Sequence, residues 1–268
     1  NGYRELWKRF AERIKAVPQP VNSFARMTGL MDALADTTAY IPAATPWEDN
    51  AQERAMPDVP LLQQAHLTAA IAVCLMHLSA EEVESLHHLG QGVHAETKLV
   101  GRLVKADFSG IQTFIYRITE PASDRSYRYT AKRLRARSLH LALLNQAVGE
   151  WLLERLDLPP TQLLYAGGGI IEWLLPCDVD FATPLTELAQ ALFDEPVFNG
   201  ALGLVWADTV LRPADFADIH LARTALESNL GSEKERKASH LLQTPGFFAP
   251  ETIFHVCQIC GLTPTDRE

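Results

Sequence analysis

The pattern of hydrophobic and polar positions changes its period near residue 98. Before that point apolar residues recur at helical spacing, as in NGYRELWKRFAERIKAV (1–17) and in the Ala- and Leu-rich run LTAAIAVCLMHL (67–78). Ser79 followed three residues later by Glu82 predicts the start of a further helix that Gly90 ends. Residues 39–60 hold four prolines and predict a long ordered loop. We therefore expect residues 1–95 to be helical.

Beyond residue 98 the pattern alternates between strands and helices. Strands are expected at 98–108, 161–168, 169–176 and 201–210, and helices at 127–156 and 183–193. In the long helix one face should be buried, and it carries Leu134, Ser138, Leu141, Asn145, Val148 and Leu152. The order β-α-β-β-α-β predicts a ferredoxin-like unit over residues 96–215, with helices on one face of a four-stranded antiparallel sheet. The expected fold class is α+β.

We expect residues 216–268 to form a helical linker that leads into a metal-binding element. Cys257-Gln258-Ile259-Cys260-Gly261 has the form of a zinc knuckle, in which two thiolates bind one ion. One such pair supplies only half of a tetrahedral site, so further ligands are required. Cys74, in an apolar helix, and Cys177, after a proline, are interpreted as packing residues.

Composition narrows the classes of function. The 268 residues are 47% hydrophobic with a net charge of −9, which is typical of a globular chain and argues against a surface coated for non-specific nucleic-acid binding. No run approaches the roughly 18 apolar residues that a membrane helix needs. Four cysteines without a secretion signal favour the reducing cytoplasm. Because the chain begins with Asn1, we take it as an excerpt of a longer polypeptide.

One basic segment contrasts with the negative net charge of the chain. Residues 125–149 contain six Lys or Arg and no acid. For the four at the start of the long helix we favour contact with phosphate or with a neighbouring subunit over a merely solvated face: Lys132, Arg133, Arg135 and Arg137. Tyr127 and Tyr129 alternate with Arg125 and Arg128, a pattern that fits either RNA stacking or an ordinary exposed loop.

Two glycine-containing breaks are expected to form one site. In a β-α-β-β-α-β unit the end of the first strand lies beside the central hairpin, so Asp107 and the loop Phe108-Ser109-Gly110-Ile111 should neighbour Gly167, Gly168 and Gly169. Backbone N–H groups there could hold phosphates. One carboxylate cannot hold two metals, which predicts a nucleotide-facing surface without catalytic machinery. The alternative is that Asp107 caps a turn and the glycines only form a tight hairpin.

Three motifs carry a resemblance to a known family. ADFSGIQTFIYRIT, AKRLRARSLHLALL and LLYAGGGIIEWLLP resemble the first palm domain of the large subunit of type III CRISPR–Cas effector complexes, most closely the Csm-type member. The resemblance implies an RNA-guided complex with crRNA, target RNA and other Cas subunits. In that family two palms condense ATP into cyclic oligoadenylates. The second palm holds Mg or Mn through an acidic GGDD hairpin, and a linker domain binds zinc.

The chain also departs from the family pattern. The sequence ends at Glu268, before a second palm, and a second CxxC pair is expected beyond it. Gln63 and Gln64 stand where the family has a metal-binding Asp-His pair, so we expect a degenerate HD-type region without nuclease activity. His66, His77, His87, His88 and His94 are interpreted as surface or packing residues. The alternatives to a synthase subunit are a non-catalytic scaffold of the same complex or, more remotely, a stand-alone palm-type regulator.

Overall fold

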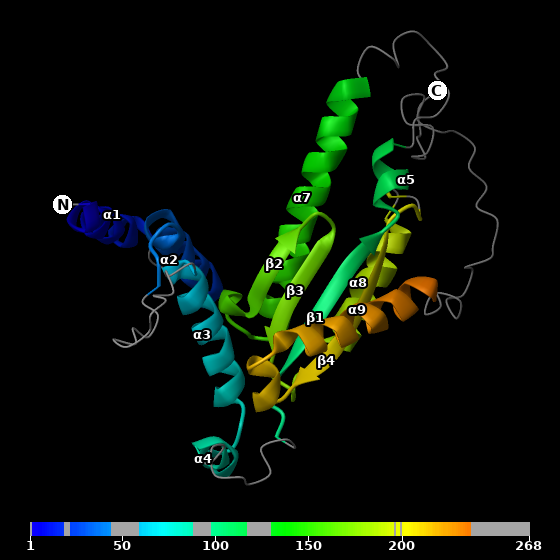
Figure 1. The fold of residues 1–268 in the computed structure, drawn as a ribbon. Coiled ribbons are helices and arrows are strands. Elements are labelled where there is room, and N and C mark those ends of the chain that lie inside the picture. Colours follow the sequence, from blue (N-terminus) through cyan, green and yellow to red (C-terminus); the bar gives the residue numbers. More distant parts are fainter. Residues whose placement is uncertain are drawn as a thin grey trace, which may run out of the picture.

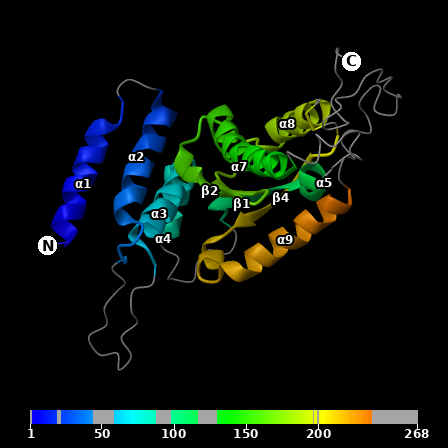
Figure 2. The same cartoon turned by 90° about the horizontal axis from the view of Figure 1, so that it is seen from above.

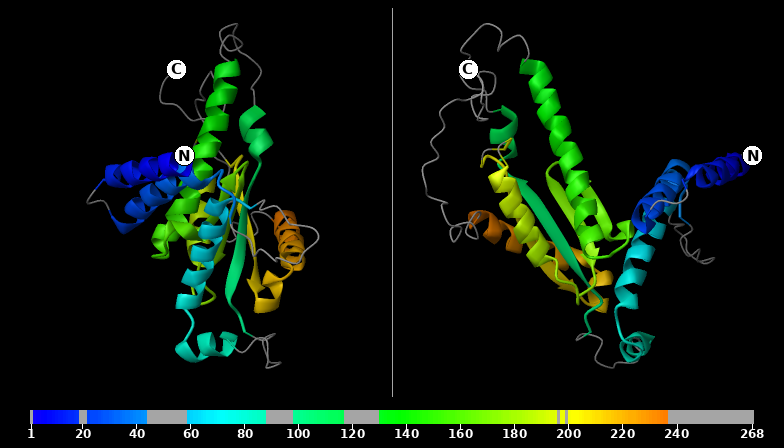
Figure 3. Two further views of the ribbon diagram at one scale, coloured as in Figure 1. Left: turned by 60° about the vertical axis from the view of Figure 1, so that its left-hand side comes forward. Right: turned by 180° about the vertical axis from the view of Figure 1, so that it is seen from behind.

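The computed structural model describes residues 2–18, 22–43, 59–87, 98–116, 130–195, 197–198 and 200–236. Its first part is helical, as the sequence predicts, with α1 (Gly2–Ala16), α2 (Ser23–Thr38), α3 (Leu61–Met76) and α4 (Ala80–His87) (Figure 1). Helix α1 lies against α2 and extends away from the rest of the molecule (Figure 3). Within these residues no helix combines the length and the apolar character that a membrane span requires.

The second part is built on a four-stranded sheet. Its elements are β1 (Gly101–Ser109), α5 (Ile111–Tyr116), α7 (Thr130–Arg155), η3 (Pro160–Gln162), β2 (Leu163–Gly167), β3 (Ile170–Leu175), α8 (Ala182–Asp194), β4 (Gly203–Leu211), η4 (Pro213–Phe216) and α9 (Ile219–Glu235). The strands lie in the order β2-β3-β1-β4, and every neighbouring pair is antiparallel. This agrees with the expected mixture of helices and antiparallel sheet.

Alternation along β1 sorts its side chains onto two faces of the sheet. Val104, Ala106 and Phe108 belong to the core that α7 and α8 cover, whereas Leu103 packs with Leu226 of α9 on the opposite face. Figure 2 shows α7 and α8 on one side of the sheet and α9 on the other. This agrees with the expectation that the unit's own helices, α7 and α8, share one face, but a helix covering the opposite face was not predicted. Helix α9 comes from the segment that was expected to be a linker, and its apolar stripe covers the second face.

Helix α7 packs against the sheet through the face that the helical period predicts. Leu141, Asn145, Val148 and Leu152 are buried. Ser138, assigned to the same face, is exposed instead. The reason is that the first turns of α7 extend beyond the end of the sheet, so nothing in the sheet lies opposite them (Figure 1).

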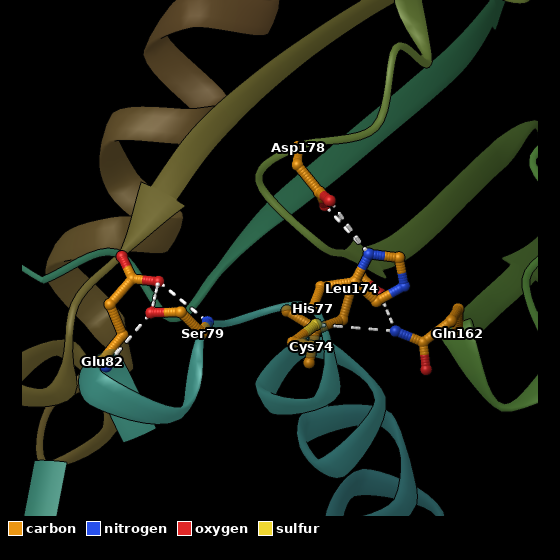
Figure 4. A network of polar contacts seen from close by, with 7 residues as sticks. All are labelled: Cys74, His77, Ser79, Glu82, Gln162, Leu174 and Asp178. Atoms are coloured by element: carbon orange, nitrogen blue, oxygen red, sulfur yellow. Dashed lines mark hydrogen bonds and ion pairs between the residues drawn. The ribbon is translucent and has the colours of Figure 1, made fainter. Parts of the chain in front are cut away.

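Helix α3 is joined to the sheet by apolar and polar contacts. Ala70 and Cys74 are buried against the sheet in the same core as Leu174. The fully buried Gln162 donates from Nε2 to the backbone oxygen of Leu174 at 2.5 Å (Figure 4). It also donates to the backbone oxygen of Ala70 at 3.2 Å, which ties the helix to β3. Because buried polar groups need such partners, Gln162 fixes how the helical part and the sheet meet.

The predicted start of the fourth helix is confirmed by its cap. The Ser79 N–H donates to Glu82 Oε2 at 2.9 Å, and the Glu82 N–H donates to Ser79 Oγ at 3.3 Å (Figure 4). Hydrogen bonds from the Ser79 backbone and hydroxyl lower the pKa of the Glu82 carboxyl. Gly90, predicted to end this helix, lies outside the described residues, as does most of the proline-containing loop.

Candidate functional site

The two glycine-containing breaks lie side by side at one end of the sheet. Asp107 is the register partner of Ile170, and the Phe108 N–H donates to the Gly169 oxygen at 2.8 Å. Gly168 and Gly169 form the two-residue turn between β2 and β3, with φ of +64° and +93°. Positive φ at both positions is the geometry of the tight hairpin turns that match sheet twist. The predicted adjacency is confirmed.

The glycines serve different purposes. A Cβ on Gly169 would lie 2.2 Å from Ile111 Cδ1, and one on Gly110, where φ is +85°, would lie 1.9 Å from the Ala201 backbone oxygen. At Gly110 the obstacle is backbone, which leaves no space for a side chain. At Gly169 the obstacle is the end of a flexible side chain, so the positive φ is the stronger reason for glycine there. Among the described residues, nothing lies within 4 Å of a Cβ added at Gly168. Gly168 is thus the tip of the hairpin, with open space before it.

The loop after the first strand is shorter than the sequence suggested. Phe108 and Ser109 are still part of β1, and Ser109 pairs with Gly203 of β4. The Phe108 N–H is already used by Gly169, and its side chain is buried in the core. The Phe108 side chain therefore packs in the core beneath the site, and its backbone N–H is not free to bind a phosphate. The turn at Gly110 leads directly into α5 at Ile111.

Asp107 faces α9 and meets a lysine there. Its Oδ2 lies 2.5 Å from Nζ of Lys234, in the last turn of α9. The Asp107 side chain is 16% exposed and that of Lys234 is 46% exposed. The partner of the carboxylate is thus a distant helix, and not the turn that follows it in the chain. Sequence reasoning missed Lys234 because the two residues are 127 positions apart in the chain.

Glu172, the first acid after the glycines, is held in a buried charge cluster. Lys105 Nζ lies 3.2 Å from Glu172 Oε1 and also contacts Glu227 of α9, while Arg223 of α9 lies 3.4 Å from Glu172 Oε2. Burial lowers the pKa of Lys105, but hydrogen bonds to Glu227 and Glu172 outweigh it and the net pKa is raised. With these cations as its partners, Glu172 is not available as a second metal ligand beside Asp107.

An exposed aromatic residue completes the α9-facing surface near the hairpin. Tyr165 of β2 is the register partner of Glu172, and 52% of it is exposed. Its hydroxyl would lie 3.0 Å from a Cβ on Gly167, so the ring extends along the strand toward the hairpin tip. The register shift between Leu163 and Tyr165 sets this orientation. The sequence pattern alone does not reveal such a shift.

One of the basic residues near the start of α7 has a clear structural role. Arg137 donates to the Ile115 backbone oxygen at 3.2 Å and stands over the Phe114 ring, so it ties α7 to α5. Lys132 and Arg135 are exposed, and Arg133 is half-buried. Their expected contacts with phosphate or a neighbouring subunit stay predictions.

The residues at the expected nuclease position lie on the first turn of α3. Gln63 and Gln64 are both exposed there. Nearby, His66 Nε2 lies 2.8 Å from the Thr161 oxygen, and His77 Nδ1 lies 3.0 Å from Asp178 Oδ1 (Figure 4). Both histidines make contacts with the sheet part, in agreement with the packing interpretation. Among the residues that the structure describes, no three His, Cys, Asp or Glu side chains group as metal ligands.

Two of the four cysteines lie among the residues that the structure describes. Cys74 is buried, and burial raises the pKa of its thiol to about 12. Burial likewise raises the pKa of Cys177, which is partly exposed. High thiol pKa values suit inert packing residues rather than nucleophiles. Cys257 and Cys260, the predicted zinc ligands, lie outside the described residues.

A separate cavity of about 470 Å³ lies at the far end of the sheet from the hairpin. It is lined by His77, Leu78, Glu82, Lys98, Leu99, Cys177 and Asp178. Several of its polar groups already have partners in the protein. His77 pairs with Asp178, and Glu82 accepts a hydrogen bond from Ser79 at the start of α4 (Figure 4). We interpret it as a gap at the boundary between the helical part and the sheet, distinct from the hairpin site.

Comparison with known proteins identifies the family. Residues 100–251, more than half of the chain, match the family model described as Csm1 subunit domain B. The chain belongs to the Csm1 family. It is 29% identical, over 81% of its length, to the single-strand-specific deoxyribonuclease Cas10/Csm1 (subtype III-A) of Methanocaldococcus jannaschii, and covers 27% of that protein.

Solved Csm1 structures share its fold. A Csm1–Csm4 cassette in complex with cA3 superposes with a TM-score of 0.65 at 25% identity, over 92% of this chain and 31% of that one. A Csm1–Csm4 cassette in complex with one ATP gives a TM-score of 0.66 at 24% identity, over 93% and 31% respectively. The chain thus spans less than a third of the length of these Csm1 relatives.

Proposed function

We propose that this chain binds ATP at the glycine hairpin as the first palm of a type III-A large subunit, and that a second palm completes cyclic oligoadenylate synthesis. Residues 96–215 form the palm, a ferredoxin-like unit, and residues 1–95 form a degenerate HD-type region. Support comes from the strand order β2-β3-β1-β4, from the Csm1 domain B match and from a related cassette that binds cA3.

The observation that carries the proposal is the open hairpin tip beside the end of β1. No described residue lies within 4 Å of a Cβ added at Gly168, while Gly169 and Phe108 hold the turn against β1 through a 2.8 Å hydrogen bond. A rigid turn without side chains allows a ligand to approach the backbone closely, and exposed N–H groups then bind phosphate. Tyr165 offers a flat aromatic face near the same tip, on which an adenine can stack.

The charges of the site fit a binding role without metal chemistry of its own. Asp107 is paired with Lys234 and Glu172 with Lys105, so neither of these two carboxylates is free to bind a metal. Two-metal nucleotidyl transfer needs a pair of free carboxylates. The metals, Mg²⁺ or Mn²⁺, would therefore be held by the acids of the second palm. This palm would hold the nucleotide and orient it through Gly168, Tyr165 and the backbone at Gly110.

The remaining parts of the chain support assembly rather than chemistry. We propose that the exposed Lys132 and Arg135 contact crRNA, target RNA or another Cas subunit, Csm4 being the partner in the related cassettes. Gln63 and Gln64 leave the helical region without its metal ligands and without DNase activity. Cys257 and Cys260 would bind zinc together with further thiols. The complex would work in the cytoplasm, where Cys74 and Cys177 remain reduced.

The test uses the complete large subunit, reconstituted with its complex, and the substitution Gly168→Asn. Asn tolerates positive φ, so the hairpin should form while an added side chain fills the space before its tip. We expect ATP affinity to fall roughly tenfold, and target-dependent messenger synthesis to fall with it. Gly200→Asn, at a loop position with the same φ of +64°, is the matched control. Unchanged affinity and synthesis in Gly168→Asn would leave a non-catalytic scaffold as the better assignment.

A further inference from the structure

We infer that Lys234 of α9 is a ligand for the triphosphate of the bound nucleotide, and that Asp107 holds it in place until the nucleotide arrives. The inference rests on the proposed function, because it names a further residue of the same site. It assigns a binding role to a helix that the sequence suggested was only a linker. The ligand class is a nucleoside triphosphate.

The position of Lys234 is the first argument. Its Nζ reaches Asp107, whose register partner Ile170 is the first residue after the turn formed by Gly168 and Gly169. Its ammonium therefore lies on the face of the sheet that Tyr165 and Asp107 share, next to the hairpin. A phosphate chain that approaches the hairpin backbone from this face comes within reach of a flexible lysine side chain.

The energetics of the pair are the second argument. Lys234 is 46% exposed, and a pair with one exposed partner contributes little to stability because water screens it and holding the side chain costs entropy. Helix α9 is already fastened by the buried residues Ala222, Leu226 and Leu230 and by the inner charge cluster around Lys105. Attachment of α9 therefore does not depend on a lysine at position 234.

The exchange of partners is the third argument. A triphosphate carries several negative charges and more acceptor oxygens than one carboxylate, so it competes well for an exposed ammonium. The Lys105–Glu172 pair differs, because both side chains are about nine-tenths buried and no ligand reaches them. Of these two ion pairs, only Asp107–Lys234 has a member that is exposed enough to change partner. Asp107 thus holds the lysine near the hairpin in the free protein, and the lysine moves to the triphosphate when the nucleotide binds.

The experiment compares the affinities of the complete large subunit for ATP and for adenosine, measured by calorimetry. Adenosine lacks the triphosphate, so the ratio of the two affinities isolates the phosphate contacts. We expect Lys234→Ala to lower the ATP affinity at least about tenfold and to leave the adenosine affinity unchanged. Lys234→Arg should restore most of the loss. Arg223→Ala, which removes another α9 cation paired with the sheet, should change neither affinity.

Asp107→Asn provides a test of opposite sign. It removes both the competitor for Lys234 and a negative charge near the phosphates, so the ratio of ATP to adenosine affinity should rise. If Lys234 and Asp107 only fasten α9, both substitutions should instead lower the two affinities alike, and the inference is overturned. A wild-type subunit that binds ATP normally, with Lys234→Ala unchanged, overturns only the inference. A wild-type subunit that binds no ATP overturns the proposed function itself.

Discussion

The ammonium of Lys105 on β1 lies 3.2 Å from the carboxylate of Glu172 on β3, and α9 covers both side chains. Glu172, the first acid after the hairpin glycines, is therefore a structural partner in a buried charge cluster. Such clusters are sensitive to the loss of one member, because the other charge is left buried without compensation. The cluster binds the second face of the sheet to α9.

Lys105→Met should destabilise the protein by about 3 kcal/mol, since Glu172 would keep only the half-exposed Arg223 as a partner. The free energy of unfolding from urea titration measures the loss. The double substitution Lys105→Met with Glu172→Leu removes both buried charges and should recover most of it. A double variant no more stable than the single one would contradict this account.

Gly110→Ala should prevent normal packing of the loop between β1 and α5. Its Cβ would lie 1.9 Å from the Ala201 backbone oxygen, at a φ of +85° that disfavours any side chain. We expect a loss of at least about 3 kcal/mol of stability. The control is Gly231→Ala in α9, where a Cβ meets nothing and helix propensity should improve stability by roughly 0.5–1 kcal/mol. Equal unfolding midpoints for the two variants would refute the steric argument.

Tyr165→Ala should weaken the binding of ATP and of adenosine by similar factors, because stacking involves the base that both ligands share. The expected loss is about 1–3 kcal/mol of binding free energy. Calorimetry on the complete subunit measures it, and Tyr165→Phe, which keeps the aromatic face, is the control. Loss of ATP binding with adenosine binding intact would show that Tyr165 contacts phosphate and does not stack on the base.

The sheet and its hairpin could be read from the sequence because their signals are local. Alternating apolar residues and the glycine turn place β2 and β3, and the order of elements then places Gly169 beside Phe108. The burial of Leu141 and Val148 in α7 follows equally from the helical period. Each of these features is fixed by residues close together in the chain.

The ion pairs of the site could not be predicted in the same way. The pairs Asp107–Lys234 and Lys105–Glu227 join residues more than a hundred positions apart, and no sequence pattern records which acid meets which base. Their existence depends on α9 covering the second face of the sheet. The orientation of Tyr165 depends on a register shift in β2 that the apolar pattern does not show.

Gly168→Val should destabilise the hairpin, whereas Gly168→Asn should not. Lack of space is not the reason, because no atom in the part of the chain that the structure describes lies within 4 Å of a Cβ at this position. The reason is the φ of +64°, which a β-branched residue adopts only at a cost of about 1–3 kcal/mol and which Asn adopts readily. Urea unfolding of the two variants measures the difference.

Weak ATP binding by Gly168→Val would then reflect a distorted turn as much as a blocked site. Gly168→Asn, with a stable hairpin and an occupied tip, separates the two causes. If both variants unfold at the same urea concentration, the turn is not held at positive φ, and Gly168 is a glycine only because of what binds in front of it.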